Sequence, residues 1–344
     1  MIKNSTDFKI DVVYVNYHSY DDIIRSINSL YKIFLKDPSL FFNVFIVDNS
    51  FCEARNELST RLVNYSTSKN HESFQIKYIP SNSNIGFGSA CNKGSKHGKS
   101  NHILFVNCDT DFRTTNIKEL KNLLSLCKNN VAIAAPKIIN ENNYLHSSCF
   151  SFDPISILLK PFRTIRKIGK FTKFIPEYSL IKKRIDRITY EGLDKSKPTL
   201  VDWLSGCFLI IRRDFFESVE GFDSRFFMYF EDVDICRKAR KFGLKTLFEP
   251  RIKIVHRGSY QSSRGKNLIN ILLFNKAARY HIISWLKYLY KWRFDFYWKI
   301  LSKFKSKTKN NDYIDNTIEK YNLNFSSFEI FEYESNYPKK SRDI

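Results

Sequence analysis

The stretch Ile10-Asp-Val-Val-Tyr-Val-Asn16 combines β-branched and aromatic residues and ends on a polar side chain, as a buried strand does. A helical pattern follows between residues 21 and 35, where apolar side chains recur every three or four positions. A strand followed directly by an amphipathic helix predicts the first unit of an α/β fold.

Three more stretches repeat this pattern further along the chain. They are Val44-Phe-Ile-Val-Asp48, Ile76-Lys-Tyr-Ile79 and His102-Ile-Leu-Phe-Val-Asn107, with helical segments between them. Strands that alternate with helices predict a mixed, mainly parallel sheet flanked by helices, and ligands of such sheets bind beyond the carboxyl ends of the strands. The polar residues expected at those ends are Asn16, Asp48, Asn84-Ile-Gly86 and Asn107-Cys-Asp109.

A second informative stretch is Phe226-Phe-Met-Tyr-Phe-Glu-Asp-Val-Asp-Ile-Cys-Arg-Lys-Ala-Arg240, in which acids follow an aromatic run and open a helical pattern. Acids at a helix start are favoured by the helix dipole, so their presence alone demonstrates no chemistry. The flanking sequence favours a site, because the strand-like residues 201–211 precede the acids and His256 follows an apolar alternation. We therefore expect an acidic turn at the floor of a site.

Each of these polar positions also has a purely structural explanation. The turn after Asp48 and the glycine loop at residues 84–88 could serve only to shape the backbone, and His256 could be an ordinary half-buried histidine. Asn107-Cys-Asp109 is the stronger signal, because it ends an apolar strand with an acid. A hard cation such as Mg²⁺ or Mn²⁺ prefers one or two carboxylates together with substrate phosphate oxygens.

Length and cysteine usage limit the class of protein. The chain has 344 residues, enough to bury a sizeable core. Its seven cysteines are scattered singly, without a C-x-x-C pair, which favours reduced thiols and a cytosolic location over disulfides or a zinc knuckle. The first residues lack the apolar core of a signal peptide, and no apolar run approaches the ~20 residues that span a bilayer. We expect a protein that is soluble or lies on a membrane surface.

The net charge of +21 is concentrated in two segments. Residues 251–309 hold fifteen Lys or Arg against one acid, and residues 160–187 hold ten against two. Between residues 279 and 305 the bases alternate with aromatic side chains, a composition that suits the headgroup region of an anionic membrane. Two alternatives are a basic helix that packs on its own domain and a nucleic-acid-binding surface, for which the sequence carries no motif.

The order of these motifs resembles that of family-2 glycosyltransferases over residues 8–265. The matching positions are Val13-Tyr-Val-Asn-Tyr17, Ile46-Val-Asp-Asn49, Asn84-Ile-Gly-Phe87 with Asn92, Phe105-Val-Asn-Cys-Asp109, Gly221-Phe-Asp223, Tyr229-Phe-Glu-Asp-Val-Asp-Ile235 and His256. More narrowly, residues 201–206 and 227–234 resemble bacterial rhamnosyltransferases that build O-antigen and related cell-surface polysaccharides. The resemblance implies a GT-A fold, which is Rossmann-like, a nucleotide-sugar donor, a divalent metal and inversion at the anomeric carbon.

The resemblance also implies where donor and metal would bind. Its nucleotide-sugar-binding positions are Val15, Asn16, Asp48, Asn84, Gly86, Asn92 and Asn107, with Asp48 on the nucleotide base. Asp109 matches the last acid of the metal motif, and His256 matches the histidine that helps to bind Mg²⁺ or Mn²⁺. The motif departs from its plain form at Asn107, which replaces an Asp, and at Cys108, where relatives often have Pro. Asn at the first position is common in the rhamnosyltransferase-like branch, so metal binding is still expected.

The catalytic base of the family is matched by Asp232. It would accept the proton of an acceptor hydroxyl as that hydroxyl attacks the anomeric carbon, while the metal balances charge on the departing diphosphate. Glu231 and Asp234 would orient the acceptor or raise the pKa of Asp232. Preferring Asp232 to Glu231 follows from the resemblance, because spacing alone is compatible with either. Trp203 and Gly206 could form an acceptor shelf, although a tryptophan in a strand is more often core.

These observations predict an inverting glycosyltransferase that moves L-rhamnose from dTDP-β-L-rhamnose to an oligosaccharide on a polyprenyl diphosphate. It would act from the cytoplasm as a peripheral protein at the inner face of the cell membrane. One alternative is a UDP-hexose donor in capsule or lipopolysaccharide synthesis, and another is a non-catalytic scaffold on the membrane surface. Nucleic acid is not an expected partner, because the sequence carries no nucleic-acid-binding motif; a steep salt dependence of binding to random DNA would be the signature of such a protein.

The expected domain organisation has three parts. A GT-A glycosyltransferase domain covers residues 1–265 and carries a basic insertion at residues 150–195, near the acceptor side. Amphipathic basic helices at the membrane surface cover residues 266–309. A tail of unassigned role covers residues 310–344.

Overall fold

The computed structural model describes residues 8–50, 55–146, 148–152, 197–258 and 275–293. The chain divides into two compact units, residues 1–291 and residues 292–344, and every element named below belongs to the first unit. This unit extends beyond the expected boundary at residue 265 and includes a further helix. Most of the basic insertion at 150–195, the residues flanking that helix, and the tail at 310–344 lie outside the described residues.

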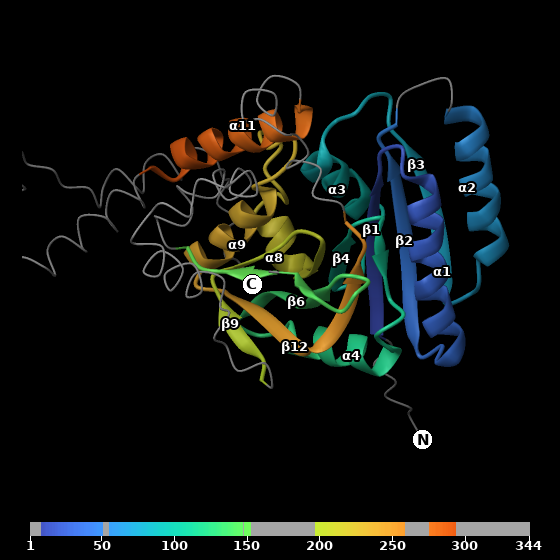
Figure 1. Ribbon diagram of the computed structural model, residues 1–344. Coiled ribbons are helices and arrows are strands. Elements are labelled where there is room, and N and C mark those ends of the chain that lie inside the picture. The colour runs from blue at the N-terminus through green and yellow to red at the C-terminus, as the bar shows by residue number, and fades with distance from the viewer. Residues whose placement is uncertain (1–7, 51–54, 147, 153–196, 259–274, 294–344) are drawn as a thin grey trace, which may run out of the picture. The chain divides into compact units, whose positions relative to one another are not determined.

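A mixed sheet forms the centre of the first unit (Figure 1). Its strand order is β3 (Phe74–Pro80), β2 (Leu40–Asp48), β1 (Phe8–Asn16), β4 (His102–Val106), β11 (Phe208–Arg212), β6 (Val131–Ile139), β12 (Lys245–His256) and β5 (Thr110–Asp111). The first four strands run parallel, and β12 runs parallel to β6, whereas β11 is antiparallel to both of its neighbours. The prediction of a mixed, mainly parallel sheet is confirmed.

Four short strands complete the described β-structure at the margins. β7 (Leu145–His146) pairs with β6, and β9 (Thr199–Val201) pairs with β12. β8 (Cys149–Phe150) and β10 (Trp203–Leu204) form a separate two-stranded sheet. Pairing with a distant strand creates these elements, because two or three residues carry no periodicity of their own.

The described helices cover both faces of the central sheet. They are α1 (Tyr20–Lys36), α2 (Arg55–Lys69), α3 (Phe87–Ser95), α4 (Ile117–Leu126), α8 (Arg213–Ser218), α9 (Glu231–Lys241) and α11 (Lys276–Lys291). Figure 1 shows α1 and α2 on one side of strands β1 to β3 and α3 on the other side. None of the described helices combines the length and hydropathy needed to cross a bilayer.

The helical pattern after the first strand produces α1, with the predicted apolar face turned toward the sheet. Ile23, Ile27 and Leu30 are fully buried, in one core cluster with Val12 and Tyr14 of β1. Burial of each large side chain stabilises the fold by roughly 1.5–3 kcal/mol, so this face fixes α1 on the sheet. The packing sets the N-terminus of α1 just beyond the carboxyl end of β1.

Candidate active site

The predicted polar residues gather where the parallel strands end. Asn16 and Asp48 are the last residues of β1 and β2 and lie opposite each other in the parallel register. Val15, one residue earlier, pairs with Val47 and is half-buried. The chain turns away from the sheet at this edge, so polar groups that have no ladder bonds become available there.

The Asp48 carboxylate is fully buried and accepts hydrogen bonds from its surroundings. Its Oδ1 accepts from Asn16 Nδ2 and from the Ser50 amide, each at 2.9 Å. Its Oδ2 accepts from the hydroxyls of Tyr20 at 2.9 Å and Tyr78 at 2.6 Å. Asp48 therefore holds the ends of β1, β2, β3 and α1 together around the place where a nucleotide base is expected.

Asn49 is a residue whose role the sequence did not reveal. Its amide Nδ2 donates to the Gly86 carbonyl at 3.1 Å and to Asn84 Oδ1 at 3.3 Å, and Asn84 Oδ1 also accepts from the Gly86 amide at 3.0 Å. Asn49 is 2% exposed, and its own Oδ1 has no hydrogen-bond partner within the described structure. A buried side-chain amide that holds the loop at residues 84–86 by hydrogen bonds gives no periodic signal in the sequence.

The loop at residues 84–86 is joined to the stretch before the acidic helix. The Phe87 amide donates to the Phe227 carbonyl at 2.8 Å. Gly86 has a φ of +86°, and a Cβ there would lie 2.4 Å from that same carbonyl oxygen. Only glycine permits both the conformation and the close approach.

Asn92 of α3 binds the backbone of the loop before the acidic helix. Its Oδ1 accepts from the Phe222 amide at 2.9 Å, and its Nδ2 donates to the Phe222 carbonyl at 2.7 Å. These two bonds engage both ends of its side-chain amide, so in this structure Asn92 shapes the site through the 221–223 loop.

Asp109 and His256 meet because two short segments pair. Strand β5 begins directly after Asp109 and pairs with the end of β12, where His256 lies opposite Thr110. His256 Nε2 is 3.1 Å from Asp109 Oδ1 and 3.2 Å from Asn107 Nδ2. Gly258 leaves space beside the ring, since a Cβ there would lie 2.3 Å from His256 Cε1.

The Asp109–His256 pair fits a divalent cation. Two ligands that each lie about 2.1 Å from an octahedral ion at a right angle are about 3.0 Å apart, close to the separation seen here. No group of three or more His, Cys, Asp or Glu that could hold a metal occurs within the described residues. Mg²⁺ commonly binds through one or two carboxylates together with substrate phosphate oxygens and water.

Two cysteines lie near the pair. Burial raises the pKa of Cys108 to about 12 and that of Cys207 to about 12. A thiol held protonated in this way is a poor nucleophile. The six cysteines within the described part of the chain are free thiols.

The predicted acidic turn opens α9, with all of its acids in the first helical turn. The half-buried Asp232 accepts from the Gly206 amide at 2.9 Å and from its neighbouring Val233 amide at 2.8 Å. Glu231 is 6% exposed and lies against Gly88 of α3. A Cβ added at Gly88 would be 3.5 Å from the Cβ of Glu231. Asp232 thus binds the backbone two residues after the end of β10.

A short chain of contacts connects Asp232 to the Asp109–His256 pair. Gly206 binds Asp232, and the next residue, Cys207, accepts from the Asn107 amide at 3.0 Å. Asn107 in turn contacts His256 at 3.2 Å. The antiparallel pairing of β4 with β11 produces this juxtaposition, because Val106 lies opposite Phe208.

Two predicted site residues are engaged elsewhere. The Trp203 ring is 5% exposed and stacks on Phe150 at 4.0 Å, so it occupies the core position that its strand also predicted. Asp234 is fully buried and forms ion pairs with Lys291 at 2.7 Å and Lys238 at 3.9 Å. Asp234 thus contacts α11 and its own helix.

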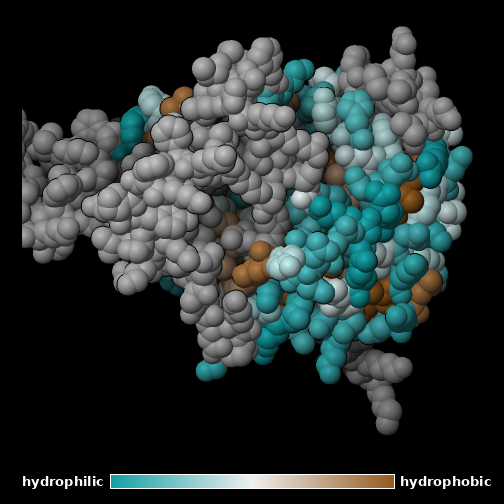
Figure 2. Space-filling view, in the orientation of Figure 1, coloured by the Kyte–Doolittle hydropathy of each residue, from teal (hydrophilic) through white to brown (hydrophobic). Residues whose placement is uncertain are grey.

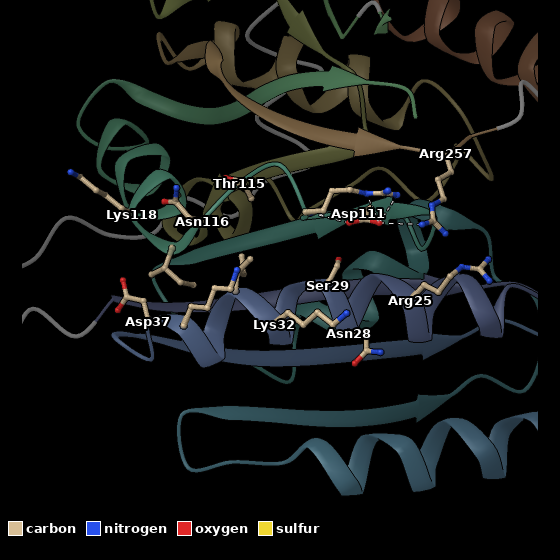
Figure 3. A pocket seen from close by; sticks show the side chains of 14 residues that line it. Arg25, Asn28, Ser29, Lys32, Asp37, Asp111, Thr115, Asn116, Lys118 and Arg257 are labelled. Carbon is tan, nitrogen blue, oxygen red and sulfur yellow. Dashed lines mark hydrogen bonds and ion pairs between the residues drawn. The ribbon is translucent and has the colours of Figure 1, made fainter. Parts of the chain in front are cut away.

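A cavity of about 780 Å³ lies beside α1 and α4, and none of the predicted site residues lines it (Figure 3). Figure 3 shows Arg25 and Lys32 of α1 along one wall and Arg257 at one end, near Asp111. Asp111 is ion-paired to Arg113 at 2.9 Å and to Arg257 at 3.1 Å. The cavity is therefore basic, and its lining residue Arg257 adjoins the cation site, because the Arg257 amide donates to the Asp109 carbonyl at 3.0 Å.

Comparison with known proteins agrees with this geometry. Residues 11–219 match the family model described as glycosyl transferase family 2. The solved structure of GalNAc-T7 with UDP, GalNAc and Mn²⁺ superposes with a TM-score of 0.57 at 15% identity, over 97% of this chain and 59% of that chain. At this identity the likeness shows the fold alone, and it confirms the predicted GT-A-like architecture.

Two curated relatives are rhamnosyltransferases. The chain is 26% identical over 159 residues to rhamnosyltransferase WbbL of Escherichia coli (strain K12), covering 42% of this chain and 53% of that protein. It is 41% identical over 64 residues to the N-acetylglucosaminyl-diphospho-decaprenol L-rhamnosyltransferase of Mycobacterium tuberculosis (strain ATCC 25618 / H37Rv), covering 19% of this chain and 21% of that protein. The matches span about half and about a fifth of these relatives.

Proposed function

Because the chain belongs to glycosyl transferase family 2, we propose that it is an inverting glycosyltransferase that moves L-rhamnose from dTDP-β-L-rhamnose onto a lipid-linked oligosaccharide. The observation that carries this proposal is the chain of contacts from Asp232 through Gly206 and Asn107 to His256 and Asp109. It brings a half-buried carboxylate close to a pair of cation ligands. That combination suits attack by a hydroxyl on a sugar diphosphate.

In the proposed reaction the side chain of Asp232 accepts the proton of the acceptor hydroxyl. The Gly206 amide, 2.9 Å from Oδ2, and the Val233 amide, 2.8 Å from Oδ1, orient the carboxylate and leave its remaining lone pairs for the acceptor. Attack comes from the face of the sugar opposite the diphosphate, so the anomeric configuration inverts. The C–O bond to the acceptor forms as the bond to the diphosphate breaks.

Asp109 and His256 would hold a divalent cation, Mg²⁺ or Mn²⁺. When bound, it supplies positive charge that stabilises the departing diphosphate. The backbone around Asp48, Asn49 and Gly86 binds the nucleotide, and the buried Asn49 Oδ1 offers an acceptor there.

The choice of sugar and acceptor follows the relatives. Both curated relatives carry rhamnosyltransferase in their names, and that of the mycobacterial protein includes a diphospho-decaprenol. These names support a dTDP-rhamnose donor and an acceptor on a polyprenyl diphosphate, as in O-antigen or other cell-surface polysaccharide synthesis. A UDP-hexose donor is the alternative that the same fold allows.

A lipid-linked acceptor requires access to the membrane surface, and α11 offers a suitable face. Ile283, Leu286 and Tyr290 are 48%, 53% and 68% exposed and recur at helical spacing with the exposed Arg279. We refer to these four residues as the outer stripe. Helix α11 contains no acidic residue, and the chain has a net charge of +21, which is complementary to anionic lipid. We place the protein peripherally, at the inner face of the cell membrane.

The test is nucleotide release by the purified protein with Mg²⁺ or Mn²⁺. dTDP-rhamnose is compared with UDP-glucose, UDP-galactose and UDP-GlcNAc, with a polyprenyl-diphosphate sugar as acceptor. Asp232→Asn should lower kcat by at least about 100-fold, since general-base catalysis contributes roughly 10²–10⁴-fold. Asp21→Asn, a change at an exposed carboxylate in α1, serves as the matched control.

Three outcomes separate the alternatives. Release from dTDP-rhamnose that is lost in Asp232→Asn supports the proposal. Release from a UDP-sugar alone keeps the mechanism and overturns the sugar. If no donor gives nucleotide release and calorimetry detects no donor binding, the result would instead support a non-catalytic scaffold.

A further inference from the structure

Helix α11 lies outside the residues that match the family model, yet it contacts the stretch that leads into Asp232. We propose that α11 is a positioning element of the active site, in which Lys291 and Ser284 hold the turn that aims the Asp232 carboxylate. This inference rests on the proposed role of Asp232 as the catalytic base. We call residues 228–230 the catalytic turn.

The catalytic turn has an unfavourable backbone conformation. Tyr229 and Phe230 both have a φ of 70°, in the left-handed region that bulky side chains rarely adopt. Two such residues in succession persist only where the surrounding structure over-determines them. Glu231 and Asp232 follow at once, so the direction in which α9 begins depends on this turn.

The inner face of α11 supplies contacts that hold the turn. The Ser284 hydroxyl donates to the Met228 carbonyl at 2.8 Å. The buried His281 ring packs edge-on against Tyr229 and Phe230, with ring centroids 5.1 Å and 5.3 Å away. The ring of Tyr288, fully buried, lies 5.4 Å from that of Phe230.

Lys291 fastens the end of α11 to both sides of the catalytic turn. Its ammonium is 2.7 Å from Asp234, which follows the turn, and 2.7 Å from Asp223, which precedes it. Both carboxylates are largely buried, with side chains 1% and 11% exposed. Lys291 thus bridges the two acids and reduces their repulsion, together with Arg225 beside Asp223 and Lys238 beside Asp234.

Asp232 is therefore held from two directions. The Gly206 amide binds its carboxylate at 2.9 Å on the side of the sheet, and α11 fixes the backbone that precedes it. On the donor side, Asp48 and Asn49 are held by other segments, and the link to this stretch is the Phe87 amide, which binds the Phe227 carbonyl just before the catalytic turn. Loss of the α11 contacts should impair the chemical step and spare donor binding.

The experiment compares Lys291→Met, Lys291→Arg and Ser284→Ala with the full-length protein. We expect Lys291→Met to lower kcat by about tenfold or more with the donor KM within about twofold, because a displacement of about 1 Å can cost about 100-fold. Lys291→Arg keeps the charge and should restore most of kcat. Ser284→Ala removes one hydrogen bond and should lower kcat by about threefold, without the folding risk of an unpaired buried carboxylate.

A second readout does not depend on turnover. Hydrogen exchange of the backbone amides at residues 229–233 should quicken in Lys291→Met and Ser284→Ala, and it should stay unchanged in Lys118→Met, a change at an exposed lysine of α4. Unchanged kcat and unchanged exchange in both variants would overturn the proposal. Activity that survives Asp232→Asn would instead contradict the proposed function, so the two failures are distinguishable.

Discussion

At the scale of single residues, buried carboxylates organise the first unit. Asp48 accepts from Asn16, Ser50, Tyr20 and Tyr78, so its charge is balanced by donors from several segments. A buried acceptor with this many donors has a structural role in addition to any contact with a nucleotide.

Replacing Asp48 with Asn should destabilise the protein. The new amide would present hydrogens to groups that are themselves donors, leaving at least one of them without an acceptor. We expect the free energy of unfolding in urea to fall by about 3 kcal/mol. Asp21→Asn, at an exposed position, should change it by no more than about 0.5 kcal/mol. A loss below about 1 kcal/mol for Asp48→Asn would contradict this assignment.

The lowered pKa of the Asp223 carboxylate should make the free energy of unfolding depend on pH in a defined way. Burial raises its pKa, but hydrogen bonds from Arg225 and the charge of Lys291 outweigh burial and hold the pKa well below its ordinary value. Asp223 therefore stabilises the fold above the unfolded pKa of about 3.9, and this contribution is lost as the pH falls through the lower folded value.

The check compares urea unfolding of the wild-type protein and Asp223→Asn between pH 7 and pH 3. The difference in free energy of unfolding should be constant down to about pH 4 and should shrink below it. A difference that already shrinks between pH 7 and pH 5 would show that Asp223 does not have the lowered pKa.

At the scale of elements, the start of α3 joins the donor side to the acidic helix. Gly86 is its N-cap and has a φ of +86°, and a Cβ at this position would lie only 2.4 Å from Phe227 O, so it could not be accommodated without a shift. The loop and the Phe227 segment are therefore built as one unit, although they are far apart in the sequence.

Gly86→Ala separates backbone strain from this close contact. The matched control is Gly243→Ala, where φ is +72° and no atom lies within 4 Å of an added Cβ. The control should cost about 1 kcal/mol of unfolding free energy from left-handed strain alone, and Gly86→Ala about 2 kcal/mol or more, with weaker donor binding by calorimetry. Equal losses for both variants would refute the importance of the Phe227 contact.

At the scale of the whole molecule, the surface of α11 combines exposed apolar side chains with basic ones. Figure 2 shows brown, apolar surface next to teal, hydrophilic surface in the region of α11. The inner face of the same helix is buried against the first unit, through Ser284 and Tyr288 among others. Packing on its own domain, which the sequence left as an alternative, thus accounts for one face of α11, while Ile283 and Leu286 of the outer stripe are about half exposed.

The outer stripe should govern binding to anionic vesicles. Changing Ile283, Leu286 and Tyr290 together to Ser should weaken co-sedimentation with anionic vesicles by about 100-fold, because burial of each side chain contributes roughly 1 kcal/mol or more. The matched control changes Leu35, Val63 and Tyr144, which are 60%, 39% and 71% exposed elsewhere, to Ser. Equal binding by the wild-type protein and the outer-stripe variant would show that the membrane contact lies elsewhere.

Local sequence patterns were sufficient for the fold class and the order of motifs. Period-2 and helical spacing predicted strands β1 to β4 and helix α1, because burial on one face imposes that spacing on the chain. The polar residues after these strands were located for the same reason, since parallel strands end at one edge. Asp232 and the Asp109–His256 pair came from the resemblance, and the structure brings them into one network.

Contacts between distant residues could not be derived from such patterns. Nothing in the local sequence indicates that Lys291 pairs with Asp223 and Asp234, or that Asn92 binds Phe222, 130 residues away. Asp234 was expected to orient the acceptor or to tune Asp232, and its ion pair with Lys291 of α11 could not be foreseen, because ion pairs depend on which segments the fold brings together. Periodicity indicates only that a side chain is buried. Its hydrogen-bond or ion-pair partner depends on how the sheet and the helices pack together.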